Sequence, residues 1–427
     1  MRNILLEKML DISIWEDLIK KADEKKIDKN LLKKLCEPKL RTEFFKAIMT
    51  DNYRIAPPRI AQIPKDNGDY RTVYINEDID RIFLSLVNEC LSILFADMIH
   101  PKCRSYQKGI GTQETVSDVV KRIKNMNGIQ NENTFIGYKT DLSKYFDSVP
   151  IEHIDKIFDF IEERLGYKKN TEPIMNILRA YYHCNLVFNL EGELIEQYTS
   201  LKQGCAVASF LSNVILYEVD NTLDKMNIVY YRYSDDIVMI GEDSIVAKSI
   251  LDEMLSKLGL QLNPNKVEKL YSDKWFKFLG FNIKGDIITL SKNRVKSLQK
   301  EIEKRSIKKK RITGQQAKNS ILHYLYKGER SWASSCLGII NCKPDIDEIN
   351  KFIMDCIRAC DTGKKKIGGL GSVNNLPDRT ILRGTGRHVK SNRLKCDKQI
   401  PGYLSLGCLS KNYKMSKCIY EATVRNL

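Results

Sequence analysis

The chain has no long apolar run and no paired-cysteine motif. No stretch of its 427 residues is apolar over the roughly 20 positions that a membrane-spanning helix needs. The N-terminus carries charges where a secretory signal needs an uninterrupted apolar segment. The 12 cysteines include no CxxC pair of the kind that binds zinc, and most stand in apolar stretches, where a free thiol behaves as a small hydrophobe. We therefore expect a cytoplasmic protein without disulfides and without membrane association.

Acidic residues are scarce in the last third of the chain. Residues 291–427 hold 30 Lys and Arg against 11 Asp and Glu, a net charge of +19, so that residues 1–290 carry −3 of the total of +16. Basic charge gathered in one region is typical of a protein that binds a phosphate backbone, because each neutralised phosphate releases condensed counterions. The alternative is a solvated basic surface that serves solubility.

Hydrophobic periodicity predicts an α+β protein. Residues 1–50 show apolar side chains at helical spacing, namely Leu5, Met9, Ile12, Trp15 and Ile19. Alternating residues then predict a β-hairpin from Ile60 with its tip near Asn67-Gly68, a strand over 134–141, and a second hairpin with Ser234-Asp235 in its turn. Helical patterns fill most of the remainder up to about residue 360, with Ser291 as the expected N-cap of a basic helix.

Three aspartates stand where separate elements could bring them together. Asp141 ends a predicted strand, and Asp235-Asp236 occupy the turn of the predicted hairpin. Adjacent carboxylates repel each other unless a cation or a hydrogen-bond donor compensates them. Two-metal phosphoryl transfer requires carboxylates that converge on a pair of Mg²⁺ ions. Turn chemistry alone also explains an Asp-Asp pair, so the neighbouring motifs decide between the two interpretations.

Five ordered segments resemble the palm motifs A to E of reverse transcriptases. They are AspLeuSerLysTyrPheAsp (141–147), LysGlnGlyCysAlaValAlaSerPheLeuSerAsn (202–213), TyrSerAspAsp (233–236), AsnProAsnLys (263–266) and PheLeuGlyPhe (278–281). Upstream, IleProLysAspAsnGlyAspTyrArg (63–71) resembles the fingers hairpin of this family. CysArgSerTyrGlnLysGlyIleGlyThr (103–112) resembles the following fingers motif of bacterial enzymes related to group II introns and retrons. The resemblance covers residues 55–285.

The resemblance implies a right-hand polymerase fold. Its fingers and palm, the palm a ferredoxin-like split βαβ sheet, would be followed by an α-helical thumb. The expected regions are an N-terminal helical extension (1–54), the fingers and palm (55–290), a basic helical thumb (291–360) and a basic, Gly-rich RNA-binding region (361–427).

The resemblance also assigns roles to individual residues. Asp141, Asp235 and Asp236 would be the catalytic residues and would hold two Mg²⁺ ions. Phe146 would lie under the sugar, where a bulky ring leaves no room for a 2′-hydroxyl. Contacts to the incoming nucleotide would come from Lys65, Arg71, Phe146, Gln203, Gly204 and Lys266. Contacts to primer and template would come from Tyr233, Phe278, Leu279, Gly280, Phe281, Lys292, Arg294 and Lys296.

Two motif positions depart from the family pattern. Ala208-Ser209 stand where motif B usually continues to Ser-Pro, and Ser234 stands where motif C usually has Ala or a larger apolar residue. Neither departure removes an expected metal ligand. The sequence shows no HNH endonuclease signature, and it most resembles the stand-alone bacterial enzymes grouped with defence-associated reverse transcriptases, which use a noncoding RNA encoded beside them.

The resemblance implies an RNA-directed DNA polymerase with Mg²⁺ as cofactor. Its expected partners are a structured noncoding RNA as template, a DNA primer or product and deoxynucleotide triphosphates, in a role that could be antiphage defence. Two alternatives are an RNA-dependent RNA polymerase, which would use the same acids, and a non-catalytic RNA-binding or maturase-like protein. The template RNA, the source of the primer hydroxyl, the form of the product and the oligomeric state are left open by the sequence.

Overall fold

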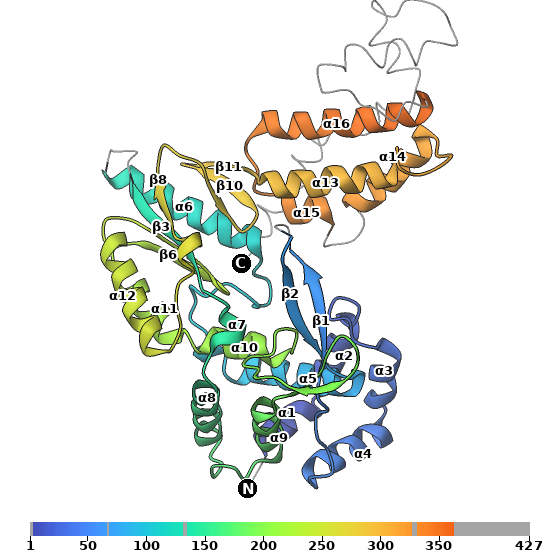
Figure 1. The fold of residues 1–427 in the computed structure, drawn as a ribbon, viewed down its shortest axis with the longest axis vertical. Helices are drawn as coiled ribbons and strands as arrows, with labels where there is room; N and C mark the ends of the chain where they lie inside the picture. Colours follow the sequence, from blue (N-terminus) through green and yellow to red (C-terminus); the bar gives the residue numbers. More distant parts are fainter. Residues whose placement is uncertain (1–2, 66–67, 131–134, 327–330, 363–427) are drawn as a thin grey trace, which may run out of the picture. The chain divides into compact units, whose positions relative to one another are not determined.

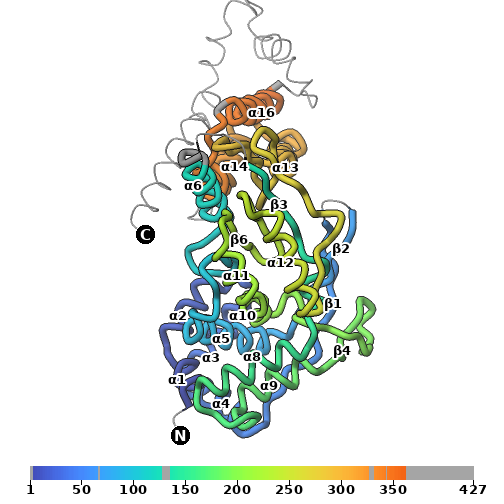
Figure 2. Tube along the Cα trace, turned by 90° about the vertical axis from the view of Figure 1, so that its left-hand side faces the viewer, coloured from blue at the N-terminus to red at the C-terminus, as the bar shows by residue number. Residues whose placement is uncertain are grey.

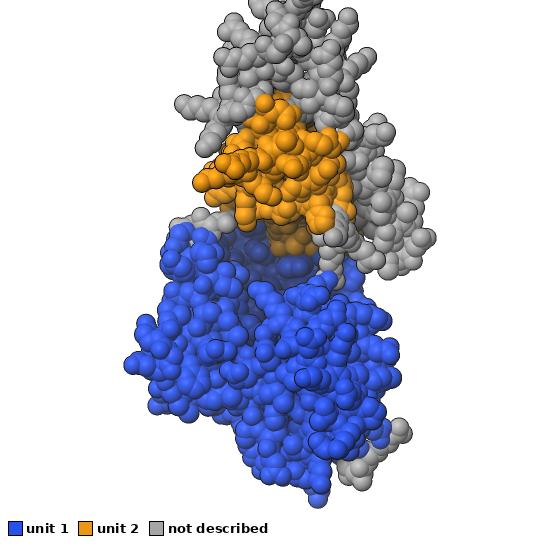
Figure 3. Space-filling model, turned by 90° about the vertical axis from the view of Figure 1, so that its right-hand side faces the viewer, with its two compact units in different colours: residues 1–111, 135–270 blue, residues 112–134, 271–427 orange. Residues whose placement is uncertain are grey.

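The structure, a computed structural model, describes residues 3–65, 68–130, 135–326 and 331–362. The chain divides into two compact units, coloured separately in Figure 3: unit 1 comprises residues 1–111 and 135–270, and unit 2 comprises residues 112–134 and 271–427. Beyond residue 362, the C-terminal region expected at 361–427 lies outside the described residues, as does Asn67 of the expected hairpin tip. Within the described ranges, no helix has the length and apolar character needed to cross a bilayer.

The N-terminal part of unit 1 is helical, as predicted, but its first helix is shorter than the apolar spacing suggests. The chain turns at Asp11, whose backbone is extended and whose carboxylate accepts a hydrogen bond from the N–H of Ser13, so a second helix begins there. Leu5, Met9 and Trp15 are buried, whereas this break leaves Ile12 exposed. The helices are α1 (Ile4–Leu10), α2 (Ile12–Lys20), α3 (Lys29–Cys36) and α4 (Pro38–Met49).

The expected fingers hairpin is present in unit 1. Strands β1 (Arg59–Pro64) and β2 (Tyr70–Ile75) pair antiparallel, with Ile63 opposite Arg71. A short hairpin of β4 (Leu186–Phe188) and β5 (Leu194–Glu196), which the sequence did not indicate, extends this sheet in the order β2-β1-β4-β5.

A second sheet of unit 1 has the strand order β6-β7-β3-β8 (Figure 1). Its strands are β3 (Ile136–Asp141), β6 (Val229–Tyr233), β7 (Asp236–Ile240) and β8 (Glu268–Tyr271). The hairpin predicted around Ser234-Asp235 is confirmed as β6 and β7, which pair antiparallel, and β7 also pairs antiparallel with β3. Ile237–Ile240 are fully buried because helices cover this sheet.

The helices of unit 1 pack with the β6-β7-β3-β8 sheet around one continuous hydrophobic core, which extends from Leu5 to Leu260. Figure 2 shows α11 and α12 beside β6 and β3. Besides α1 to α4, the helices of this unit are α5 (Asp78–Leu94), η1 (Ala96–Met98), α7 (Tyr145–Ser148), α8 (Ile151–Arg164), α9 (Pro173–His183), α10 (Val207–Val214), α11 (Tyr217–Asp224), α12 (Ser244–Lys257) and η2 (Pro264–Lys266).

Unit 2 combines a small antiparallel sheet with helices. Its sheet order is β11-β10-β9, and Ser291 caps the following helix by accepting a hydrogen bond from the N–H of Arg294, as predicted. One of these helices, α6, comes from the chain segment 112–134, which separates the two parts of unit 1 in the sequence. Its elements are α6 (Thr112–Gln130), β9 (Phe276–Phe278), β10 (Phe281–Lys284), β11 (Ile287–Leu290), α13 (Lys292–Arg305), α14 (Gly314–Tyr326), α15 (Trp332–Cys336) and α16 (Lys343–Thr362).

Candidate active site

Two of the three predicted aspartates face each other across the central ladder of unit 1. The antiparallel register of β3 and β7 places Asp141 directly opposite Asp236. On the other side of β7, Asp236 pairs with Tyr233, the last residue of β6. Because directly opposed residues in a sheet have neighbouring side chains, the fold brings motifs A and C together at one sheet edge.

Asp235 lies in the tight turn between β6 and β7. Ser234, which precedes it, has a left-handed backbone with φ of 59°, a conformation that costs free energy in any residue except glycine. The carbonyl of Asp235 accepts a hydrogen bond of 3.2 Å from the N–H of Leu142, the residue after Asp141. This bond ties the turn to the end of β3. The sequence placed both acids in the turn, but Asp236 is already the first residue of β7.

Asp141 is paired with the lysine of the AsnProAsnLys segment. The Lys266 ammonium lies 2.7 Å from the Asp141 carboxylate. Asp141 is buried, with 6% of its surface exposed. The segment is attached to β3 by its backbone, since the N–H of Asn263 donates to the carbonyl of Asp141 over 2.8 Å. The short helix η2 that follows brings Lys266 back towards the strand end. The structure therefore joins motif D to motif A.

Burial and mutual repulsion disfavour the ionised forms of Asp235 and Asp236. Burial and the charge of Asp141 raise the pKa of Asp235. Burial, followed by the charges of Asp235 and Asp141, raises the pKa of Asp236 to about 6. Lys266 opposes the rise at both groups. A cation placed among these groups would be favoured, because an opposite charge stabilises the ionised form of each carboxylate.

The donor set fits Mg²⁺, which prefers oxygen ligands and is held in enzymes by one or two carboxylates together with substrate phosphates. Among the described residues, no group of three or more His, Cys, Asp or Glu side chains is already arranged to hold a metal ion. One of the three expected ligands, Asp141, forms an ion pair with Lys266 instead. The role of Asp141, Asp235 and Asp236 as metal ligands stays a prediction.

The two fingers cations lie on the β1–β2 hairpin. The N–H of Lys65 donates to the carbonyl of Asp69 over 2.7 Å, which closes the hairpin end. Both Lys65 and Arg71 are exposed. The charge of Arg71 lowers the pKa of Asp235 against the larger effect of burial, so this guanidinium lies within electrostatic range of the carboxylates. An exposed cation so placed can contact a triphosphate.

Phe146 is neither fully buried nor free. It lies in α7 and packs against the core of unit 1, and its ring meets that of Tyr145 edge-on at 5.7 Å between centroids. Its carbonyl accepts a hydrogen bond of 3.0 Å from the N–H of Leu201, just before motif B. The contacts with Tyr145 and the core therefore hold one side of the ring, while part of its surface stays accessible. A ring that supports a sugar would require this arrangement.

Gly204 is required by the fingers strand. Its φ is 112°, and a Cβ added there would lie 2.7 Å from the carbonyl oxygen of Tyr74 in β2. The neighbouring carbonyl of Gln203 accepts a hydrogen bond of 2.8 Å from the N–H of Tyr74. The resemblance assigned Gln203 and Gly204 to contacts with the incoming nucleotide. In the structure, the backbone that approaches it belongs to β2, and the nucleotide contacts of Gln203 and Gly204 stay predictions.

The residues expected to contact the primer and template, Tyr233 excepted, lie in unit 2. Phe278 and Phe281 are buried, so the segment presents its turn at Leu279-Gly280 instead of its aromatic rings. Arg294 stabilises this turn: its guanidinium donates to the carbonyl of Leu279 over 3.1 Å and lies 4.3 Å from the centroid of the Phe281 ring. The other two cations of this set, Lys292 and Lys296, are exposed on α13.

Sequence reasoning missed two residues beside the catalytic turn. Tyr106 has a left-handed backbone and is 56% exposed, although its hydroxyl forms a hydrogen bond with Ser234. Arg232 is completely buried two residues before the turn. The signal for Arg232 was a charged residue within the apolar strand sequence ValTyrTyrArgTyr (229–233), since a buried charge requires a partner.

Two intron proteins of Saccharomyces cerevisiae are similar in sequence. The COX1/OXI3 intron 1 protein is 24% identical over 292 residues, which cover 55% of this chain and 33% of that protein. The COX1/OXI3 intron 2 protein is 26% identical over 180 residues, covering 42% of this chain and 19% of that protein. The chain thus spans a third or less of the length of these relatives.

Solved telomerase structures resemble the fold at low identity. The apo telomerase of Candida tropicalis gives a TM-score of 0.45 at 13% identity, covering 81% of this chain and 69% of that one. Telomerase from Candida albicans in complex with a fragment of telomeric RNA gives 0.42 at 11% identity, covering 82% and 64%.

The family model described as reverse transcriptase (RNA-dependent DNA polymerase) matches residues 63–283. This range is more than half of the chain, and it contains the end of β1 with β2, the sheet with Asp141, Asp235 and Asp236, and the segments that resemble motifs A to E. The fold is accordingly α+β, with the fingers and palm of a right-hand polymerase. The chain belongs to the reverse transcriptase family.

Proposed function

We propose that this protein is an RNA-directed DNA polymerase that extends a 3′-hydroxyl with deoxynucleotides by Mg²⁺-dependent nucleotidyl transfer. The observation that carries the proposal is the pairing of Asp141 with Asp236 across β3 and β7, with Asp235 in the adjoining turn. Separate chain segments supply these carboxylates, as two-metal catalysis requires. The family membership of the chain supports the same chemistry.

The proposed roles follow from the placement of each side chain. Asp141, Asp235 and Asp236 would hold Mg²⁺, which when bound lowers the barrier to attack by the primer hydroxyl and to departure of pyrophosphate. Arg71 and Lys65 would bind the triphosphate from the exposed hairpin. Lys266, next to Asp141, would donate a proton to pyrophosphate or neutralise its charge. Phe146 would support the sugar and exclude a 2′-hydroxyl.

A structured RNA is the template class that we propose. The net charge of +19 over residues 291–427 supports a partner with a phosphate backbone, and the names of the two yeast relatives associate them with introns. More specifically, we propose a bacterial enzyme that copies a dedicated noncoding RNA in antiphage defence. This last step is supported only by the resemblance of the sequence to stand-alone defence-associated enzymes.

Primer extension with matched variants tests the proposal. Wild-type protein, the double variant Asp235→Asn/Asp236→Asn, and the surface control Asp252→Asn on α12 are compared on an RNA template with Mg²⁺ and either deoxynucleotides or ribonucleotides. We expect DNA synthesis by the wild type and by the control, and none by the double variant. Synthesis that survives in the double variant would show that the site is wrongly assigned.

The same assay distinguishes the alternatives. Preferred incorporation of ribonucleotides would indicate an RNA-dependent RNA polymerase. Failure of the folded wild type to extend any primer, combined with tight binding of structured RNA, would indicate a non-catalytic RNA-binding protein.

A further inference from the structure

Arg232 is a fully buried cation directly behind the catalytic turn. Its guanidinium forms a bidentate ion pair with Asp220 of α11, at 2.7 Å from Nε to Oδ1 and 2.5 Å from Nη2 to Oδ2, and both side chains are 0% exposed. Asp220 also accepts a hydrogen bond of 2.6 Å from the hydroxyl of Tyr230. The acid thus accepts from three donor groups on two residues, and this arrangement fixes the orientation of the guanidinium.

The remaining donors of Arg232 are used on backbone carbonyls. Nη1 donates to the carbonyl of Ser234 over 3.2 Å, and Nη2 donates to that of Asn213 over 3.1 Å. Ser234 is the left-handed residue that starts the turn to Asp235, and Asn213 lies near the end of α10. A cation at the C-terminal end of a helix is favourable because the last carbonyls lack intrahelical partners.

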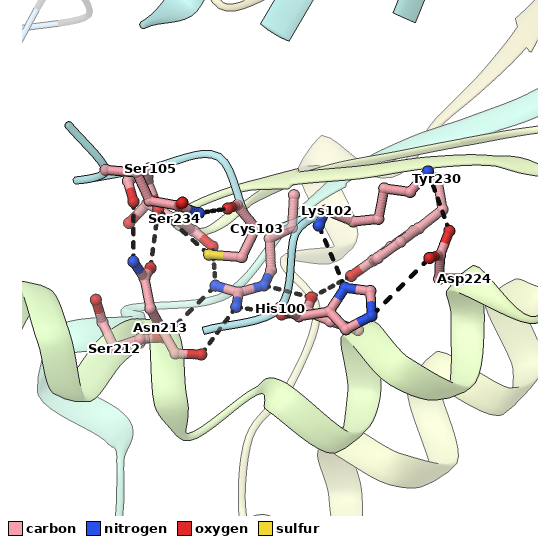
Figure 4. Close-up of polar contacts among 12 residues, drawn as sticks. His100, Lys102, Cys103, Ser105, Ser212, Asn213, Asp224, Tyr230 and Ser234 are labelled. Atoms are coloured by element: carbon pink, nitrogen blue, oxygen red, sulfur yellow. Dashed lines mark hydrogen bonds and ion pairs between the residues drawn. The ribbon is translucent and has the colours of Figure 1, made fainter. Parts of the chain in front are cut away.

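The backbone of Arg232 is hydrogen-bonded to the chain at the start of the second fingers motif (103–112). Its N–H donates to the carbonyl of Lys102, and its carbonyl accepts from the N–H of Arg104. The side chains of Ser105 and Asn213 face each other (Figure 4), and the Asn213 amide donates to the carbonyl of Ser105 over 2.8 Å. Three segments that the sequence identified as separate motifs, 103–112, 202–213 and 233–236, therefore meet around one guanidinium.

We propose that Arg232, oriented by Asp220, is a positioning residue that fixes the Ser234–Asp235 turn and thereby the place of the Asp235 carboxylate. The inference rests on the proposed function, because it treats Asp235 as a metal ligand. Arg232 acts through the Ser234 carbonyl and does not itself contact substrate or metal. Replacement of residues that orient metal ligands typically lowers metal affinity about 10- to 100-fold.

An ordinary structural ion pair is the competing explanation. Buried pairs can often be replaced by uncharged residues of similar volume without loss of stability, whereas removal of one partner leaves an uncompensated charge. A neutral replacement would satisfy the core but would leave the Ser234 carbonyl without its donor. The two explanations therefore differ in a variant that lacks both charges.

The test compares Arg232→Met with the double variant Arg232→Met/Asp220→Asn, in which the Asn oxygen can still accept from Tyr230. Binding of Mn²⁺ to the full-length protein without nucleotide is measured by electron paramagnetic resonance, beside the thermal midpoint. We expect the single variant to lose stability and the double variant to recover most of it. Mn²⁺ affinity should remain about 10- to 100-fold below wild type in the double variant. Wild-type affinity in the folded double variant would overturn the proposal.

Two further variants keep the result interpretable. Arg232→Lys retains the charge but loses the fork that reaches Asp220 and Ser234 together, so it should fold and bind Mn²⁺ more weakly; unchanged affinity there would also contradict the proposal, even if the neutral pair does not fold. Arg179→Met removes another ion pair of unit 1, with Glu162 at 2.5 Å, and should lower stability without changing Mn²⁺ affinity.

The Asp235→Asn/Asp236→Asn variant separates the two proposals. If it binds Mn²⁺ as the wild type does, the metal site itself is wrongly assigned. If it loses binding while the Arg232 variants keep it, the metal site stands and only the positioning role fails.

Discussion

The ammonium of Lys266 lies 2.7 Å from the carboxylate of Asp141, so two residues that are 125 positions apart in the sequence form an ion pair at the end of β3. The lysine side chain is more than half exposed, whereas that of Asp141 is nearly buried. Because the lysine is solvent-exposed, the ion pair contributes little to the stability of the fold. Its importance is that Lys266 competes with a metal ion for the Asp141 carboxylate.

Replacement of Lys266 by Met should separate metal binding from catalysis. Without the competing ammonium, Mn²⁺ affinity should stay equal to that of the wild type or increase. Single-nucleotide incorporation at saturating substrate should fall about 10²- to 10⁴-fold, the usual contribution of a positioned general acid. Lys257→Met, which removes an exposed lysine paired with Glu253 on α12, is the control and should change neither quantity. A parallel loss of affinity and rate would show that Lys266 only stabilises the site.

Gly204 and Gly192 form a matched pair for testing the contact between motif B and the fingers. Both have positive φ, but a Cβ at Gly192 meets nothing within 4 Å, whereas one at Gly204 would collide with the Tyr74 carbonyl. Gly192→Ala should cost about 1–2 kcal/mol of unfolding free energy from backbone strain alone. Gly204→Ala should cost about 2–5 kcal/mol because overpacking adds to the strain. Urea denaturation measures both, and equal losses would contradict the close approach to β2.

Stability should depend on pH through Lys202, which is completely buried and donates to the carbonyl of Cys184 over 3.1 Å. Burial lowers the pKa of this lysine to about 8. The unfolded chain keeps the proton up to about pH 10.4, so between these values the unfolded state binds more protons and stability rises with pH. Below pH 8 both states are protonated and the cost of the buried ammonium is fully present.

The Lys202→Met variant isolates this effect from other titrating groups. The difference in unfolding free energy between wild type and variant should shift by about 2 kcal/mol in favour of the wild type between pH 7.5 and 9.5. Urea denaturation of both proteins at the two pH values measures the shift. A constant difference would mean that Lys202 remains charged in the folded protein throughout.

Much of the fold could be predicted because its signals are local. The β6–β7 hairpin, the Ser291 cap and the N-terminal helices depend on residues close to each other in the sequence, and all are present. The break at Asp11 was missed because the apolar spacing of Leu5, Met9 and Ile12 continues across it. The β4–β5 hairpin was missed because its strands are only three residues long and gain their partner, β1, from a distant segment.

The site could be predicted only in part, since its decisive contacts are long-range. Local patterns placed Asp141 at a strand end and Asp235 in a turn, but the register that sets Asp141 against Asp236 depends on the whole sheet. The ion pair of Arg232 with Asp220 joins a strand to a helix, and neither residue alone indicates its partner. The reason for Gly204 lies in Tyr74, 130 positions earlier, beyond the reach of a motif comparison.

Phe146 should control the choice of sugar. If its accessible face supports the deoxyribose, Phe146→Val opens space for a 2′-hydroxyl, and the ratio of kcat/KM for ribonucleotides to that for deoxynucleotides should rise about 10- to 100-fold. Single-turnover incorporation of matched nucleotide pairs measures the ratio. Phe160→Val, at an exposed position on α8, serves as the control. An unchanged ratio in Phe146→Val would make the ring a structural residue.

The cations of α13 should divide into nucleic-acid contacts and a structural residue. Lys292 and Lys296 are exposed, whereas the guanidinium of Arg294 is engaged by the Leu279 carbonyl and the Phe281 ring. Each lysine that contacts a phosphate contributes about 0.7–0.9 to the slope of log affinity against log salt concentration. Lys292→Gln and Lys296→Gln should therefore each reduce this slope by that amount for an RNA–DNA duplex, without a change in thermal midpoint.

Arg294→Gln should lower the thermal midpoint instead and change the slope little, because its charge stabilises the turn at Leu279-Gly280. Fluorescence anisotropy over a salt series, beside thermal unfolding, distinguishes these outcomes, and a full slope change in a stable Arg294→Gln protein would return this arginine to the nucleic-acid contacts that the sequence predicted.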